Sequence, residues 1–321
     1  MNGTVPAAVL TAFESSTGCN VAVQSQRDAV IARRVRRGGA SVPDVVALPS
    51  GAASALAQGS FLQPLDRSGL PGLPDLLPPF RSTSWATIGG RPAGVADLWT
   101  ADVLVYRTDR LQRPPTSMGT IFDTDIVGPV VLPDSITTVA DMNLLAGSSS
   151  PFSASPETVA AARKLLLGLA ASRRTLITGP DELDDALGTG RSSIGIARTN
   201  DAATLIRRGR PVEWVVPTEG ATAIARTWSI PAGSHRSTCA YRWLEDVLQP
   251  DTQAAFSQLT GLAPTAVAAC SILAEGWCQA TGASVSGLVG SLHVAAAPGA
   301  SAITGDLDTA WARVATTPRA D

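Results

Sequence analysis

Residues 91–110 constrain the fold more than any other part of the chain, because they change from a polar loop into a β-rich run. The apolar residues 103–106 are bounded by polar side chains, which is typical of a short buried strand. Asp97, Trp99 and Asp102 precede this run, and acidic groups are costly to bury unless a polar partner is held beside them. The pattern predicts a strand that crosses between two lobes, with Asp97 and Trp99 facing the cleft between the lobes.

Length and composition favour two globular domains. The chain has 321 residues, which is too many for one small core. Hydrophobic residues make up 45% and charged residues 16%, as expected for a folded protein rather than a disordered one. The formal net charge of -2 argues against a nucleic-acid partner. No apolar run reaches the roughly 18 residues that a membrane-spanning helix needs.

Strand, turn and helix patterns alternate along the chain, which predicts an α/β fold with a parallel sheet. Residues 44–48 read as a buried strand that ends at the turn carrying Ser50, and residues 127–132 form a second strand that ends near Ser135. Residues 193–197 form a third, with Arg198 at its carboxyl end. Ligands of such sheets bind beyond the carboxyl ends of the strands. Ser50 is therefore a candidate ligand residue, or only a cap for the following helix.

Cysteine and histidine content argues against a metal site and against hydrolytic catalysis. The four cysteines contain no Cys-x-x-Cys pair, and the only histidines are His235 and His293, so a zinc site is not expected. No Gly-x-Ser-x-Gly motif accompanies a possible base, so we expect neither an enzyme nor a cofactor. Cys270 and Cys278 are close enough to form a disulfide in an oxidising compartment, or they are free thiols. A Cys19–Cys239 disulfide is the less favoured of these two possible bridges.

Several motifs together resemble one family of transport receptors. Residues 13–21 (FESSTGCNV), residues 43–46 (PDVV) followed by Pro49 and Ser50, and residues 59–66 (GSFLQPLD) are similar to the first third of extracytoplasmic solute-binding proteins. Trp99 before Val105 and Tyr106 resembles their crossing strand. Later matches are residues 229–233 (SIPAG), 240–244 (AYRWL) and 261–265 (GLAPT). Their order and spacing, over roughly residues 6–270, match the spermidine/putrescine-binding branch of ABC-transporter solute receptors.

This resemblance implies a periplasmic-binding-protein-like α/β fold of two lobes joined by hinge strands, with a ligand cleft between them. Lobe one would comprise residues 1–103 plus 227–270, and lobe two residues 104–226 plus 271–321. The expected mechanism is closure of the lobes on a small ligand and docking of the closed, monomeric protein on a membrane permease. The family has a β-strand and an export signal before the first helix. Neither pattern is present here, so we expect the true start upstream and an extracytoplasmic location.

Transferring the ligand positions of polyamine receptors onto this chain reverses their charge. The crossing-strand tryptophan is kept as Trp99, but Asp97 replaces an aromatic residue. The second-lobe acids correspond to the neutral Ser135 and Thr138. The second-lobe tryptophan corresponds to Arg198, and the tryptophan and aspartate of the return hinge correspond to Ile224 and Arg226.

Guanidinium groups would repel a polyamine and would pair with a carboxylate or phosphonate. We therefore expect a small zwitterion or anion, such as an ω-amino acid or an aminophosphonate, clamped by Arg198 and Arg226. The open alternative is that these arginines pair with protein acids such as Asp97 or Asp201 and brace the hinge, and that Trp99 is core. A true spermidine/putrescine receptor, or a ligand-sensing module not coupled to transport, are the other functional alternatives.

Overall fold

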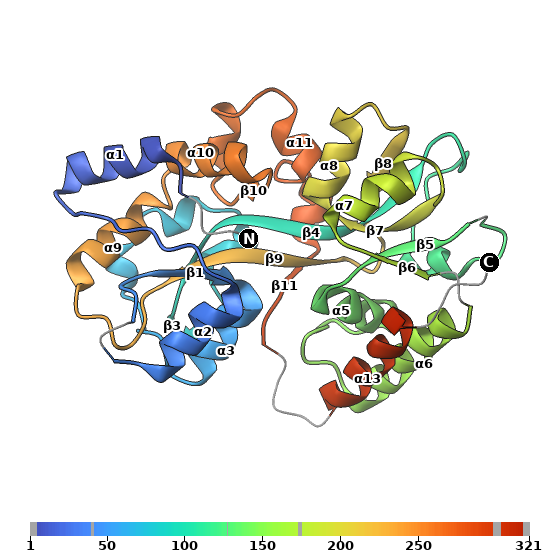
Figure 1. The fold of residues 1–321 in the computed structure, drawn as a ribbon, viewed down its shortest axis with the longest axis horizontal. Coiled ribbons are helices and arrows are strands. Elements are labelled where there is room, and N and C mark those ends of the chain that lie inside the picture. Colours follow the sequence, from blue (N-terminus) through green and yellow to red (C-terminus); the bar gives the residue numbers. More distant parts are fainter. Residues whose placement is uncertain (1–4, 40–41, 127, 173–174, 298–302, 317–321) are drawn as a thin grey trace. The chain divides into compact units, whose positions relative to one another are not determined.

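The computed structural model describes the chain except residues 1–4, 40–41, 127, 173–174, 298–302 and 317–321. The chain divides into two compact units. Unit 1 comprises Met1–Thr100, Ile224–Gly290 and Val294–Ala297, and unit 2 comprises Ala101–Ala223, Ser291–His293 and Pro298–Asp321. Strands β4 (Val95–Arg107) and β9 (Ala221–Ser229) each run from one unit into the other (Figure 1), as does β11 (Leu292–Val294).

Residues 271–290 belong to unit 1, whereas the sequence led us to expect them in the second lobe. A disulfide between Cys270 and Cys278 ties this segment to the preceding turn. Helix α11 (Trp277–Thr281) contacts β10 (Ala263–Pro264), and α12 (Ser286–Gly290) contacts α4 (Pro78–Arg81), so the segment packs on elements of unit 1.

Unit 1 contains a sheet whose described pairings are antiparallel. Strand β1 (Val46–Pro49) pairs with β9, so that Val46 lies opposite Ser229, and β10 pairs with β4, so that Ala263 lies opposite Trp99. Residues 20–24, which alternate like a strand, are not assigned to one. The other elements are α1 (Ala7–Thr17), α2 (Asp28–Arg37), α3 (Ser50–Gln58), η1 (Arg67–Gly69), η2 (Leu73–Asp75), β2 (Thr87–Ile88), β3 (Arg91–Pro92), α9 (Ser237–Asp246), α10 (Pro250–Thr260) and η5 (Val267–Ser271).

Helix α1 illustrates how local sequence sets an element of unit 1. Gly18 ends the helix in the left-handed conformation, with φ of 70°, and its N–H donates to the Glu14 carbonyl. The buried face carries Phe13, whose ring meets Trp243 of α9 edge to face at 5.0 Å. A disulfide from Cys19 to Cys239 then fixes the end of α1 to α9.

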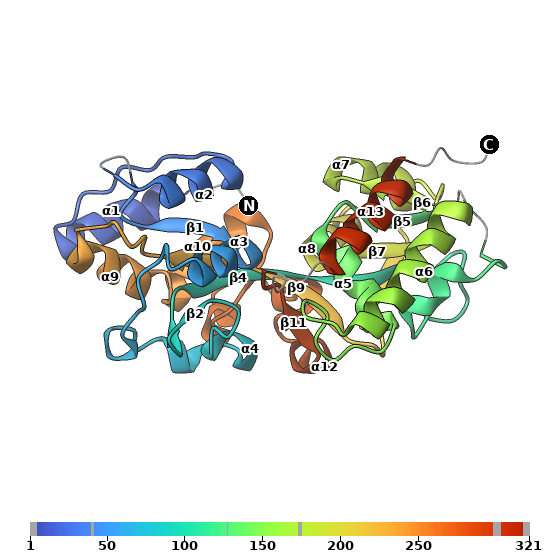
Figure 2. The same cartoon turned by 90° about the horizontal axis from the view of Figure 1, so that it is seen from below.

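Unit 2 contains the parallel sheet that the strand–helix alternation predicts. Strand β5 (Val130–Pro133) is parallel to both β6 (Thr175–Thr178) and β7 (Ile194–Arg198), whereas β7 and β8 (Val212–Val215) are antiparallel to β4. Helix α13 (Ile303–Thr316) lies along α6 (Pro156–Ser172) in both views (Figure 1, Figure 2). The remaining elements are η3 (Met118–Phe122), α5 (Ile136–Leu145), α7 (Pro180–Leu183), the π-helical turn η4 (Asp184–Gly188) and α8 (Thr199–Arg207).

The core of unit 2 lies between this sheet and the helices α5, α6 and α13, and its buried side chains include Leu132, Met142, Leu166, Ile194 and Leu307. Strands β5 and β7 approach closely at Gly195, where an added Cβ would lie 2.4 Å from the Val131 carbonyl oxygen. Among the described residues of either unit, no helix is both long enough and apolar enough to cross a bilayer.

Candidate functional site

Two helix N-termini and one arginine meet at one edge of the unit 2 sheet. Strands β5 and β7 are parallel neighbours, with Val131 opposite Gly195, so their carboxyl ends lie at the same edge. Ser135 and Arg198 are the residues immediately before α5 and α8, which begin at that edge. The first N–H groups of a helix have no partner within it and favour negative charge. This edge therefore combines two anion-favouring helix ends with a guanidinium group.

Arg198 is partly exposed and lies opposite Asp102 in the β4–β7 ladder. Its Nε is buried and has no hydrogen-bond acceptor within the described parts of the chain. The next residue, Thr199, accepts a hydrogen bond at its hydroxyl from the Ala101 N–H, at 3.4 Å. The backbone at Arg198 is therefore anchored to β4, while one donor of its side chain has no acceptor.

Two acidic side chains that the ligand transfer did not use, Asp102 on β4 and Asp141 on α5, form a buried pair. Their carboxyl groups are hydrogen-bonded to each other, and Thr137 is hydrogen-bonded to Asp102. The Thr222 hydroxyl donates to Asp141 Oδ1 at 2.7 Å. Burial raises the pKa of Asp102, against the opposing effects of Thr137 and Arg198. Burial and the neighbouring Asp102 charge raise the pKa of Asp141 well above its ordinary value.

The two neutral residues that replace polyamine-binding acids differ in accessibility. Ser135 is partly exposed and caps α5, since its Oγ accepts from the Thr137 N–H at 3.2 Å. Thr138 is fully buried, and its hydroxyl donates to the Pro133 carbonyl at 2.7 Å. Thr138 therefore anchors the β5–α5 turn, and Ser135 is the more accessible of the two hydroxyl groups.

The second predicted guanidinium, Arg226, is held in an ion pair inside unit 1. Its Nε donates to Asp97 Oδ1 at 2.9 Å, and its Nη2 donates to Asp97 Oδ2. The side chains of Arg226 and Asp97 are 2% and 0% exposed. The Arg226 Cζ also lies 4.0 Å from the ring centroid of Phe256. This is the alternative in which the arginine pairs with a protein acid, and Asp97 compensates the charge of Arg226.

The other two predicted residues of unit 1 are also buried and hydrogen-bonded within that unit. Trp99 donates from Nε1 to the Pro264 carbonyl at 3.0 Å, and its ring centroid lies 5.6 Å from that of Phe80. Ser50 is the first residue of α3, and its hydroxyl accepts from the Ala225 N–H at 3.4 Å rather than capping the helix. The suggestion that Ser50 is a helix cap is therefore wrong, because its Oγ is turned towards β9.

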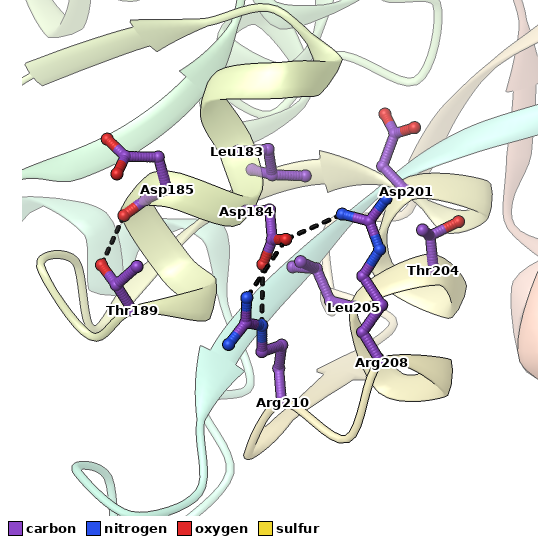
Figure 3. A pocket seen from close by; sticks show the side chains of 9 residues that line it. All are labelled: Leu183, Asp184, Asp185, Thr189, Asp201, Thr204, Leu205, Arg208 and Arg210. Atoms are coloured by element: carbon purple, nitrogen blue, oxygen red, sulfur yellow. Dashed lines mark hydrogen bonds and ion pairs between the residues drawn. The ribbon is translucent and has the colours of Figure 1, made fainter.

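A polar cavity of about 470 Å³ lies within unit 2 (Figure 3). Asp184, in the π-helical turn, accepts from Arg208 Nη1 at 2.7 Å and from Arg210 Nε at 2.9 Å. These contacts lower the pKa of Asp184, mainly through Arg210. Asp201, in the first turn of α8, also lines the cavity, and burial raises its pKa against the opposing charge of Arg198. Asp184 thus compensates the arginines of this cavity, and no sequence motif marks their association.

A second cavity of about 680 Å³, with both apolar and polar lining residues, lies within unit 1. It is bordered by the segment between α1 and α2, by β1, and by α9. Aromatic side chains from three elements line it: Phe13, Trp228 and Trp243. Across the described residues, no cluster of three His, Cys, Asp or Glu side chains has the arrangement of a metal site.

All four cysteines of the chain form disulfides. The predicted Cys270–Cys278 bridge is confirmed, with a Cα–Cα distance of 5.8 Å. The less favoured Cys19–Cys239 pair is also bridged, with Cα atoms 5.9 Å apart. The sequence offers little support for this second pair, because its residues are 220 positions apart and meet only when α1 packs on α9.

Comparison with known proteins identifies the fold. Residues 8–272 match the family described as bacterial extracellular solute-binding protein. The spermidine/putrescine ABC transporter substrate-binding protein PotD of Streptococcus pneumoniae superposes with a TM-score of 0.79 at 18% identity, covering 98% of this chain and 96% of that one. An agropinic-acid-binding protein of A. tumefaciens R10 gives 0.62 at 19% identity, covering 95% and 90%. A GABA receptor of this fold gives 0.71 at 16% identity, covering 96% and 93%.

These matches confirm the periplasmic-binding-protein-like α/β fold and the resemblance to transport receptors of the polyamine type. The family match extends over most of the chain, from α1 to the turn at η5, and therefore includes the crossing strands β4 and β9. The protein belongs to the family of bacterial extracellular solute-binding proteins.

Proposed function

We propose that this protein is the solute receptor of an ABC importer and that its ligand is a small anion or zwitterion held in part by Arg198. The observation that carries the choice of ligand is the buried Nε of Arg198, which has no acceptor among the described residues. A ligand carboxylate or phosphonate would supply that acceptor and would compensate the guanidinium charge. Arg226, by contrast, already has Asp97 as its partner and is not part of this proposed site.

The surroundings of Arg198 support a ligand with a negatively charged group. The nearby N-termini of α5 and α8 favour an anion, and the partly exposed Ser135 adds no charge of its own. Asp201 lies on the first turn of α8, three positions after Arg198, and would offer a carboxylate to a ligand ammonium group. An ω-amino acid or an aminophosphonate carries both of the groups that such a pair of side chains would bind.

In this proposal the receptor closes on its ligand, and the crossing strands β4 and β9 bend as it does so. The closed monomer then docks on a membrane permease outside the cytoplasm. A sensing role would use the same closure with a different partner. Structurally similar proteins are named for agropinic acid and GABA as well as for spermidine and putrescine, so this fold serves ligands of different charge. A polyamine receptor remains the second candidate, because Asp201 is an acid near the same edge.

The proposal is tested by thermal-shift and calorimetric titration with 4-aminobutyrate, 2-aminoethylphosphonate, putrescine and spermidine. We expect stabilisation by one of the first two compounds, because a ligand that binds only the folded state raises its stability. Arg198→Gln should weaken that binding by about tenfold to a hundredfold, the range for losing a hydrogen bond to a charged group. Arg207→Gln, on the exposed part of α8, is the matched control and should bind normally.

Two results would contradict the proposal. Micromolar binding of spermidine without binding of either zwitterion would favour the polyamine receptor. Binding of a zwitterion that Arg198→Gln leaves unaltered would show that Arg198 does not hold the ligand.

A further inference from the structure

The acid pair, Asp102 and Asp141, lies where three elements of unit 2 meet. Asp102 is on β4, one position after the chain enters unit 2 at Ala101. Asp141 is in the middle of α5, and it accepts from Thr222, near the point where β9 leaves unit 2. The pair therefore joins α5, whose N-terminus contributes to the proposed anion site, to both principal crossing strands.

Two carboxyl groups in this contact require a proton. Ionised carboxylates only accept hydrogen bonds, so two of them cannot bond to each other unless one carries a hydrogen. Asp102 is 2% exposed and Asp141 is 0% exposed, so water does not separate their charges. The Oδ2 atoms of both residues receive no hydrogen bond from the rest of the described chain. Like charges in such a buried position disfavour double ionisation, and the two groups titrate as one system.

The charge of the pair acts directly on Arg198. Asp102 faces Arg198 across the β4–β7 ladder, and Asp201 faces it from α8. The other groups around the pair are the neutral hydroxyls of Thr137 on α5 and Thr222 on β9. With one proton shared, the pair carries a single negative charge beside Arg198. Without that proton, the pair carries two negative charges beside one guanidinium.

We propose that Asp102 and Asp141 share one proton and that this proton sets how much positive charge Arg198 presents to an anionic ligand. This inference rests on the proposed function, since it assigns a specificity-determining role to two residues behind the same site. Loss of the shared proton as pH rises adds a negative charge behind Arg198 and weakens anion binding. The pair is a positioning and tuning element, and neither acid contacts the ligand.

The test compares isosteric variants by calorimetric titration of 4-aminobutyrate from pH 5 to 9. In the unmodified protein, affinity should fall as the pair loses its proton, by up to about tenfold per pH unit above that transition. Asp141→Asn keeps an acceptor for Thr222 and supplies an N–H to Asp102, so it holds the pair permanently in its singly charged state. Its affinity should not fall over the same pH range. Asp102→Asn removes the charge opposite Arg198 and should raise the affinity by about tenfold or more.

Asp185→Asn is the control, because it makes the same substitution at an exposed acid of unit 2. It should keep the pH dependence of the unmodified protein. A ligand-free readout accompanies the binding data: carbon-13 NMR of the aspartate side chains should show Asp102 and Asp141 titrating together in two separated steps.

Each failure is separately identifiable. Independent titration of the two carboxyl groups near ordinary aspartate values, or an Asp141→Asn variant with unaltered pH dependence, would overturn the inference while leaving ligand binding by Arg198 in place. If 4-aminobutyrate and 2-aminoethylphosphonate bind at no pH, the proposed function fails and the tuning role falls with it, whatever the NMR titration shows about the proton.

Discussion

Replacing Asp97 with Ala is expected to destabilise unit 1 by about 3–5 kcal/mol, the cost of leaving one member of a buried ion pair alone. The structure supports the upper part of this range for two reasons. Both side chains are at most 2% exposed, so water cannot replace the lost carboxylate. The guanidinium of Arg226 also lies against Phe256, at 4.0 Å from the ring centroid, so an aromatic ring rather than water covers it on that side.

The double variant Asp97→Leu with Arg226→Met should behave differently. Both charges are removed together, and the methionine replaces a guanidinium that lies against the aromatic rings of Phe256 and Trp228. Replacing a whole buried ion pair with apolar side chains is often neutral or stabilising, by about 1–4 kcal/mol. The single and double variants together form a cycle that separates the coupling of the pair from the packing of its side chains.

Intrinsic fluorescence in chemical and thermal denaturation is a suitable assay, because most tryptophans report on unit 1. Five of the seven lie there: Trp85, Trp99, Trp228, Trp243 and Trp277. For domains of this size each kcal/mol corresponds to about 2–4 °C in Tm, so Asp97→Ala should lower the Tm by roughly 6–20 °C.

Two outcomes would refute this reasoning. One is a loss below about 1 kcal/mol for Asp97→Ala, the value of an exposed ion pair. The other is a double variant that folds normally but no longer binds the ligand of the unmodified protein. That result would indicate that Arg226 binds the ligand, as the sequence led us to expect, and that the ion pair opens when ligand binds.

Further predictions concern packing, disulfides and pH. Gly195→Ala should destabilise unit 2 by about 1–3 kcal/mol in thermal denaturation, because the added Cβ would lie 2.4 Å from the Val131 carbonyl oxygen. The control Gly168→Ala in α6, where nothing lies within 4 Å of the added Cβ, should stabilise by about 0.5–1 kcal/mol. Equal effects of the two substitutions would contradict the close approach of β5 and β7. If loop entropy dominates, replacing both cysteines of the Cys19–Cys239 disulfide with Ala should lower the free energy of unfolding by about 5 kcal/mol, because the two residues are 220 positions apart. The same replacement at Cys270–Cys278, 8 positions apart, should lower it by about 2.5 kcal/mol. A larger loss for the Cys270–Cys278 variant in urea denaturation would exclude that explanation. The raised pKa of Asp141 contributes stability at acidic pH, and this contribution is lost as pH rises through the pKa of the folded state. The free energy of unfolding, compared with that of Asp141→Asn, should therefore fall with increasing pH. A free-energy difference between the two proteins that is constant from pH 4 to 9 would contradict the raised pKa.

Local patterns in the sequence were sufficient for many elements and for the family. The alternation of strand, turn and helix anticipated β1 with α3, β5 with α5, and β7. The short spacing of Cys270 and Cys278 made their bridge a reasonable expectation. These features depend on residues that are near each other in the chain, where turn chemistry and hydrophobic periodicity act.

Longer-range pairing decided what the local patterns left open. Residues 20–24 have a strand-like alternation but no strand pairing among the described residues, since alternation favours a strand only where another edge is available. Residues 271–290 joined unit 1 through contacts that no composition signal announces.

The partners of the charged groups are the clearest case. Asp97 and Arg226 are 129 positions apart, and whether Arg226 meets that acid or a ligand depends on how β4 and β9 bring the two residues together. Asp102 and Asp141 likewise become a pair only when α5 packs beside β4. The sequence alone determined which ionisable groups the chain carries and which elements hold them. Only the tertiary structure decided which of them compensate one another, because a charge is set by its neighbours in space and by their exclusion of water.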